Sequence, residues 1–162
     1  MSAALEHPAS TAHYGGQFLT FRLEPEEYGV QILQVQEIKE WERATRVPNS
    51  PDYVEGVLNL RGLIVPVVDL RLRLGLPGRE RDDRTVIIVV QIEGRLAGFT
   101  VDSVTDVIDI APDECCPVPE YDGQTDRDFI SGLARREGRL LILLEVAHLL
   151  DRRIAERSHG LP

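Results

Sequence analysis

Apolar residues recur along this chain in short runs of alternating or near-alternating character, a pattern that predicts β-strands. In the first half, the pattern predicts strands over residues 18–23, 28–33, 54–60 and 63–70. A turn at Arg61-Gly62 joins the last two. Because proline has no backbone N–H to donate, Pro66 predicts that its strand lies at a sheet edge or carries a bulge there.

One segment of the first half has a different period. Val35, Ile38 and Trp41 are spaced by three, with glutamine and glutamate between them, which predicts one or two helical turns. The second half returns to strands, predicted over 85–92, 97–101, 130–135 and 140–145, with turns at 93–94 and 137–138.

The two halves are related by an internal repeat. A shift of 69 residues pairs Leu19 with Ile88, Gly29 with Gly98, Val35 with Val104, Glu37 with Asp106 and Ile38 with Val107. A shift of 76 residues pairs Gly56 with Gly132, Gly62 with Gly138 and Asp69 with Glu145. The difference of seven residues is a longer loop in the second half, the proline-rich stretch 111–128. Each half has about 60 residues, too few to bury a generous core alone, so the halves are expected to share an apolar seam.

The repeat also predicts which side chains are buried. Residues paired by the 69-residue shift are expected near the seam, namely Val35, Ile38, Val104 and Val107. Val67 and Leu143, which the 76-residue shift relates, are expected on the inner faces of their strands.

The domain boundaries follow from composition. Residues 1–16 and 152–162 are interpreted as a flexible tail and as a C-terminal helix end with a tail. Residues 17–151 are interpreted as one domain, with barrel halves at approximately 17–75 and 85–150, and exchange of strands between the halves is left open. Closed barrels remove the exposed edges of such short strands.

Charge narrows the classes of partner. The chain has 27 acidic against 18 basic residues and a net charge of −9, which argues against nucleic acid or anionic lipid as a partner. Its apolar runs are too short to span a bilayer, which takes about 20 residues. The start lacks a charged-then-apolar leader, and Cys115 and Cys116 are adjacent, so a reducing cytoplasm is expected.

The sequence contains no recognisable catalytic constellation. His148 lies in an apolar run and is interpreted as a packed histidine, and the two cysteines have no histidine nearby. The glycines form no phosphate-binding loop. Asp102, Asp106 and Asp109 do not match a calcium loop and are interpreted as solvated carboxylates. A non-catalytic binding module without cofactor or metal is therefore expected.

One thirteen-residue stretch, Asn59-Leu-Arg-Gly-Leu-Ile-Val-Pro-Val-Val-Asp-Leu-Arg71, resembles the signature of the CheW family of bacterial chemotaxis coupling proteins. Segments in the same order and spacing extend the resemblance over roughly residues 17–151, including 27–30, 32–38, 98–107, 130–133 and 140–150. The resemblance implies an all-β fold of two SH3-like five-stranded β-barrels packed together, with short helices.

The resemblance also implies a role. It implies an adaptor that links the signalling tip of methyl-accepting chemoreceptors to the regulatory domain of the histidine kinase CheA. Such a protein is cytoplasmic, is recruited to membrane-associated receptor arrays, and does not insert into the membrane.

The candidate interface residues come from the motif, from the segments around the predicted seam, from the repeat-related glycines and from the proline-flanked loop, where Tyr121 is a candidate exposed anchor. They are Val35, Glu37, Ile38, Gly56, Asn59, Arg61, Gly98, Val104, Val107 and Tyr121. Val35 is interpreted equally well as core or as interface. Arg61 is either a solvated turn charge or a partner of a carboxylate such as Glu37, and the second interpretation is favoured because the motif carries the residue. For the glycines, turns or close backbone approach are the simpler interpretation.

Two other classes of function are weighed. A module that binds proline-rich peptides would need a groove lined with aromatic residues, whereas aromatic residues make up only 6% of this chain and are scattered. A metal-dependent enzyme would need to use the carboxylates between Asp102 and Asp109, and a metal-dependent thermal shift would distinguish it from an adaptor.

Overall fold

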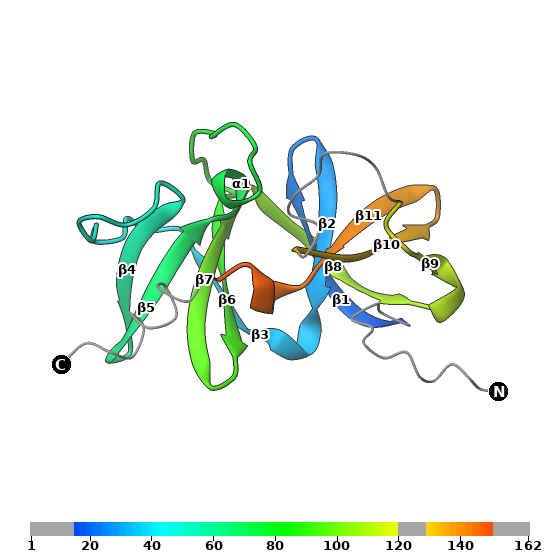
Figure 1. Cartoon of the computed structure of the whole chain (residues 1–162), viewed down its shortest axis with the longest axis horizontal. Coiled ribbons are helices and arrows are strands. Elements are labelled where there is room, and N and C mark those ends of the chain that lie inside the picture. Colours follow the sequence, from blue (N-terminus) through cyan, green and yellow to red (C-terminus); the bar gives the residue numbers. More distant parts are fainter. Residues whose placement is uncertain (1–14, 120–128, 151–162) are drawn as a thin grey trace.

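The computed structural model describes residues 15–119 and 129–150, and its strands form two sheets (Figure 1). The six-stranded sheet has the order β8 (Ser103–Ile110), β1 (Gly16–Leu23), β2 (Glu26–Gln31), β11 (Arg139–Leu144), β10 (Ile130–Arg136) and β9 (Cys115–Cys116). The five-stranded sheet has the order β3 (Val35–Glu40), β6 (Val86–Ile92), β7 (Arg95–Val101), β5 (Leu63–Asp69) and β4 (Val54–Leu60). The helices are short: η2 (Ile32–Gln34), α1 (Leu70–Arg73), η3 (Pro112–Glu114) and η5 (Val146–His148). The predicted all-β class with short helices is confirmed.

The internal repeat is visible in the strand order. Replacing each strand of the series β8-β1-β2-β11-β10 by its repeat counterpart gives β3-β6-β7-β5-β4, the order of the other sheet. The register obeys both shifts, because Val67 pairs with Gly98 in one parallel ladder and Leu143 pairs with Gly29 in the other. Each sheet thus takes strands from both halves of the sequence. The sheets therefore do not coincide with the halves 17–75 and 85–150.

Pro66 lies in a strand that has a neighbour on each side, but only over part of its length. Pairing of β5 with β7 begins at Val67, so Pro66 is paired with β4 alone, opposite Val57. Pro66, which has no backbone N–H, therefore lies where β5 has no neighbouring strand on the β7 side. In the other sheet, the equivalent ladder starts two residues earlier, at Leu141.

The helical turns predicted over Val35, Ile38 and Trp41 are wrong. Residues Val35–Glu40 form strand β3, and the only helical residues nearby are the three of η2. The register of β3 against β6 shifts between Val35 and Glu37, which marks a bulge. The extra residue of the bulge changes the spacing between Val35 and the next apolar residue, Ile38, from two to three. This spacing in a strand has the same sequence pattern as a helix.

The core has three parts. The largest cluster lies between the sheets and takes side chains from both, such as Phe21 of β1 and Phe99 of β7. Each barrel also has a smaller cluster of its own. Val67 belongs to one and Leu143 to the other, and both side chains are fully buried, as predicted. In the part of the chain that the structure describes, no helix has the length and apolar character to cross a bilayer.

Candidate partner-binding surface

The two terminal strands of the five-stranded sheet, β3 and β4, are linked through Thr45, a residue that follows β3. Strand β4 continues the sheet to Thr45, which follows β3, through reciprocal 2.9 Å backbone hydrogen bonds between Thr45 and Val57. This contact needs a glycine at position 56, since a Cβ there would lie 2.1 Å from the Thr45 carbonyl oxygen. The sheet is thereby closed into a barrel.

Arg61 and Glu37 form the ion pair that sequence analysis favoured. Arg61 lies at the β4–β5 turn with φ 52°, and its Nη2 donates to Glu37 Oε1 of β3 at 2.5 Å. The Arg61 side chain is 66% exposed and that of Glu37 27%. The hydrogen bond from Arg61 lowers the pKa of Glu37, so Glu37 carries its charge throughout the neutral range. The pair presents both charges at the surface beside the barrel closure.

Three other candidates have local structural roles. The Asn59 side chain accepts a 2.8 Å hydrogen bond from the Gly62 N–H, which stabilises the two-residue turn of the hairpin. Gly56 is buried beneath Thr45. Gly98 is also buried, and a Cβ there would lie 2.7 Å from Ile87 Cγ2. The burial of both glycines favours the simpler interpretation, close backbone approach, and their place among the interface candidates stays a prediction.

The four predicted seam residues occupy equivalent positions. Their partners in register all belong to the cluster between the sheets; the pairs are Val35 with Val90, Ile38 with Ile88, Val104 with Phe21 and Val107 with Leu19. Directly opposed residues point to the same face of a sheet. Val35 and Val104 pack against the cluster, whereas Ile38 and Val107 are 43% and 48% exposed. The seam prediction therefore holds fully for Val35 and Val104. Ile38 and Val107 lie at the exposed rim of the seam. Tyr121 lies outside the described residues.

The structure adds a residue that sequence analysis missed. Leu33 of η2 is 94% exposed, although the sequence pattern places it at the end of a strand. The hydrophobic pattern does not distinguish Leu33 from a core residue, because it gives no sign that the strand ends and η2 begins at Ile32. We call Leu33, Val35, Glu37, Ile38 and Arg61 the β3 surface, since they lie along η2 and β3, the terminal strand of its sheet, or are bonded to it. Val35 and Ile38 lie on the face of the central cluster, and Glu37, opposite Val89 of the smaller cluster, lies on the other face.

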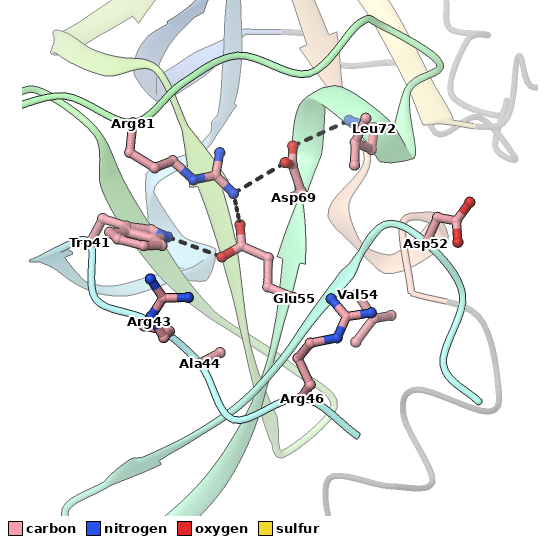
Figure 2. A pocket seen from close by; sticks show the side chains of 10 residues that line it. All are labelled: Trp41, Arg43, Ala44, Arg46, Asp52, Val54, Glu55, Asp69, Leu72 and Arg81. Atoms are coloured by element: carbon pink, nitrogen blue, oxygen red, sulfur yellow. Dashed lines mark hydrogen bonds and ion pairs between the residues drawn. The ribbon is translucent and has the colours of Figure 1, made fainter. Parts of the chain in front are cut away.

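A cavity of about 260 Å³ lies beside the same barrel (Figure 2). Arg81 of the α1–β6 connection donates to Glu55 Oε2 and, at 3.2 Å, to Asp69 Oδ2, and its guanidinium lies 5.4 Å from the centre of the Trp41 ring. Trp41 Nε1 donates to Glu55 Oε1 at 3.0 Å. These polar groups bind each other, so the network fixes the connection against the barrel.

The candidate chemistry considered from sequence is dispersed in the structure. Asp102 binds Arg71 and Arg79, and Asp106 accepts a 2.8 Å hydrogen bond from Thr20. Among the described residues, no group of three or more metal-ligating side chains is present. Cys115 and Cys116 are free thiols in β9, and burial raises the pKa of Cys115, so thiolate formation there is disfavoured at neutral pH.

Comparison with known proteins decides the family. Residues 17–153 match the CheW-like domain. The chain belongs to the CheW-like domain family. It is 41% identical over 137 residues to the chemotaxis protein CheW of Klebsiella aerogenes, spanning 85% of this chain and 82% of that protein. It is 36% identical over 145 residues to the CheW of Bacillus subtilis, spanning 89% and 92%.

A solved structure agrees with this assignment. The scaffolding protein TtCheW from Thermoanaerobacter tengcongensis superposes with a TM-score of 0.79 at 33% identity, covering 86% of this chain and 95% of that one. The CheW-like fold of paired SH3-like barrels is thus confirmed for this chain. The thirteen-residue stretch that carries the resemblance, residues 59–71, lies in the β4–β5 hairpin and the start of α1.

Proposed function

We propose that this chain is a non-catalytic adaptor that couples chemoreceptors to the histidine kinase CheA in a chemotaxis-type array. The observation that carries the proposal is the CheW-like match over residues 17–153, with relatives named as chemotaxis proteins and a structural neighbour named as a scaffolding protein. The proposed partners are the receptor signalling tip and the regulatory domain of CheA. The proposed site of action is the cytoplasmic side of membrane-associated receptor arrays.

The β3 surface is the proposed contact region, together with Val104 and Val107 at the related rim. It combines an exposed leucine with a paired, surface-exposed arginine and glutamate. Aliphatic side chains supply apolar area for docking, while an exposed charge pair favours one orientation of a partner.

Reconstitution tests the proposal. CheA autophosphorylation from ATP is measured with receptor-containing membranes, in the presence and absence of this chain. An adaptor raises the receptor-dependent rate in a saturable manner and is retained by receptor fragments in pull-down experiments. An identical rate with and without saturating chain would refute coupling. Stoichiometric transfer of phosphate from CheA to this chain would refute the non-catalytic role.

A further inference from the structure

The chain passes between the two sheets twice within the described residues. It leaves the six-stranded sheet through η2, between β2 and β3, and returns between β7 and β8 at Asp102. The 69-residue shift relates the two crossovers, since 33 plus 69 gives 102 and so pairs Leu33 with Asp102. The repeat therefore permits a direct comparison of the two sides of the seam.

The crossover at Asp102 is held by a dense polar contact. Asp102 Oδ2 accepts from Arg71 Nη1 at 2.7 Å, from Arg79 Nη1 at 2.9 Å and from the Glu24 N–H at 2.8 Å. The side chains of Arg71 and Asp102 are only 9% and 10% exposed. Arg71 also donates to the carbonyl oxygens of Glu24 at 3.1 Å and Pro77 at 2.7 Å. We call this group the crossover clamp, after its central residues Arg71 and Asp102.

The crossover clamp joins elements of both barrels. Arg71 belongs to α1, which follows β5 of the five-stranded sheet, and Glu24 lies in the β1–β2 turn of the six-stranded sheet; α1 and this hairpin lie next to each other in Figure 1. A second arginine of α1, Arg73, also contacts residues next to both sheets. Arg73 lies between the rings of Tyr53 and Phe129, at 4.6 and 4.5 Å from their centres, and donates to the Leu149 carbonyl at 2.7 Å.

Within residues 15–119 and 129–150, the related crossover has no ion pair equivalent to the clamp. The residue equivalent to Asp102 is Leu33, which is apolar and 94% exposed. The 76-residue shift takes Arg71 to Ala147 and Arg73 to Leu149, neither of which has a charge to donate. The crossover at Asp102 is therefore fixed by a buried arginine–carboxylate pair, and the crossover at η2 has no such ion pair among the described residues.

We infer that Arg71 and Asp102 are positioning residues, which set the angle between the two barrels at one crossover and leave adjustment to the other, at η2. Apolar contacts in the seam are non-directional, whereas hydrogen bonds to a carboxylate restrict angle as well as distance. A buried ion pair contributes little net stability compared with apolar side chains of the same size, so its effect is expected in geometry more than in stability. Because η2 adjoins Val35 and Glu37, the clamp also determines the shape of the β3 surface, a step that rests on the proposed function.

The test measures the angle directly. Spin labels are placed at Gln91 of β6 and Arg135 of β10, one exposed position in each sheet, in a background with Cys115 and Cys116 changed to serine. Pulsed dipolar spectroscopy gives the distribution of the distance between the labels. The clamp variant is the double change Arg71→Met and Asp102→Asn, which removes both charges together because a single change would leave one buried charge unpaired.

The matched control removes an ion pair within one sheet. Arg139 of β11 binds Glu27 of β2 at 2.6 Å, and the Glu27 side chain is 8% exposed. The double variant Arg139→Met and Glu27→Gln is expected to keep the narrow distance distribution of the parent, whereas the clamp variant shifts or widens it. A folded clamp variant with the parental distribution would overturn the inference. So would an equal change in the control.

Binding of a receptor signalling fragment is measured on the same proteins. We expect weaker binding for the clamp variant than for the control. Normal binding despite a changed distance distribution would overturn the link from the clamp to the β3 surface. If the parent itself binds no receptor fragment, the proposed function fails, and the distance distributions alone still decide whether the clamp sets the angle.

Discussion

At the scale of single residues, the Arg61–Glu37 pair tests whether a motif residue acts in folding or in binding. Arg61→Ala is expected to leave the free energy of unfolding nearly unchanged, because exposed ion pairs contribute little to stability. It is expected to lower receptor-dependent CheA activity, because the charges lie on the β3 surface. Melting curves and the reconstituted kinase assay measure the two effects.

A charge exchange is the control for this variant. Glu37→Arg alone should impair coupling, and combining it with Arg61→Glu should recover part of the activity if the pair itself orients the surface. Full activity of folded Arg61→Ala would mean that the Arg61–Glu37 pair has no part in coupling.

Gly56 gives a second prediction at the residue scale. Gly56→Ala is expected to destabilise the protein by about 3 kcal/mol or more, because the new Cβ would overlap the Thr45 carbonyl and open the barrel closure. Gly62→Ala is the matched control. Gly62 also has positive φ, at 89°, but a Cβ there meets nothing within 4 Å, so only about 1 kcal/mol is expected. Urea unfolding measures both, and equal losses would contradict the steric explanation.

The same residues mark how far sequence reasoning extends. The Arg61–Glu37 pair could be proposed from the sequence, because the motif carries Arg61 and an arginine suits pairing with a carboxylate. Glu37 itself lies outside that motif, on β3. The role of Gly56 could not, because its reason is the carbonyl of Thr45, which the barrel closure brings against it. Leu33 could not either, since its exposure depends on η2 interrupting a strand-like pattern.

At the scale of elements, the inner face of β11 carries the core of its barrel. Leu143→Ala is expected to cost about 2–5 kcal/mol, because Leu143 is fully buried against Phe18 and Leu141 in the barrel cluster. Total stability is typically only about 5–15 kcal/mol, so the midpoint of unfolding should fall markedly. Leu140→Ala in the same strand, at a position 53% exposed, should change it little. A similar small change for Leu143→Ala would show that the inward face of β11 was misassigned.

Some element boundaries were predictable from the pattern, whereas the strands predicted over 28–33 and 97–101 are observed over 26–31 and 95–101. The prediction of 54–60 coincides with β4, and the turns at 93–94 and 137–138 are present. The prediction failed at β3, where the bulge between Val35 and Glu37 changes the spacing. The related strand β8 has a register shift against β1 at the matching place, so Val104 and Val107 are also spaced by three. The repeat therefore preserves the irregularity along with the strands.

At the scale of the whole molecule, the repeat predicts two similar units but not which strands form each unit. The shifts of 69 and 76 residues hold equally for halves that fold separately and for halves that exchange strands. Deciding between them requires the lengths of the crossovers: β2 reaches β3 through the three residues of η2, and β7 reaches β8 through Asp102 alone. Connections this short carry the chain directly into the neighbouring sheet, so exchange follows from geometry that alternation does not encode.

Strand exchange gives the last prediction, which compares two fragments of nearly equal length. Residues 35–102 contain β3 to β7, a complete five-stranded sheet with all of its internal pairings. Residues 17–83 correspond to a sequence half, but β1, β2 and β3 have lost their partners β8, β11 and β6. This fragment keeps only the hairpins β1–β2 and β4–β5, and isolated two-stranded hairpins are marginally stable at best. Fragment 35–102 is therefore expected to show a β-sheet circular dichroism spectrum and dispersed amide resonances, and fragment 17–83 neither.

Fragment 35–102 should still melt below the full chain, because it exposes side chains such as Phe99 and Ile88 that the other barrel covers. Adding the remainder of the chain in trans should raise its melting temperature if the seam re-forms. A folded 17–83 beside an unfolded 35–102 would contradict the exchanged topology. Failure of both fragments to fold would mean that pairing within one sheet is insufficient, and that the apolar seam between the barrels is required for either to form.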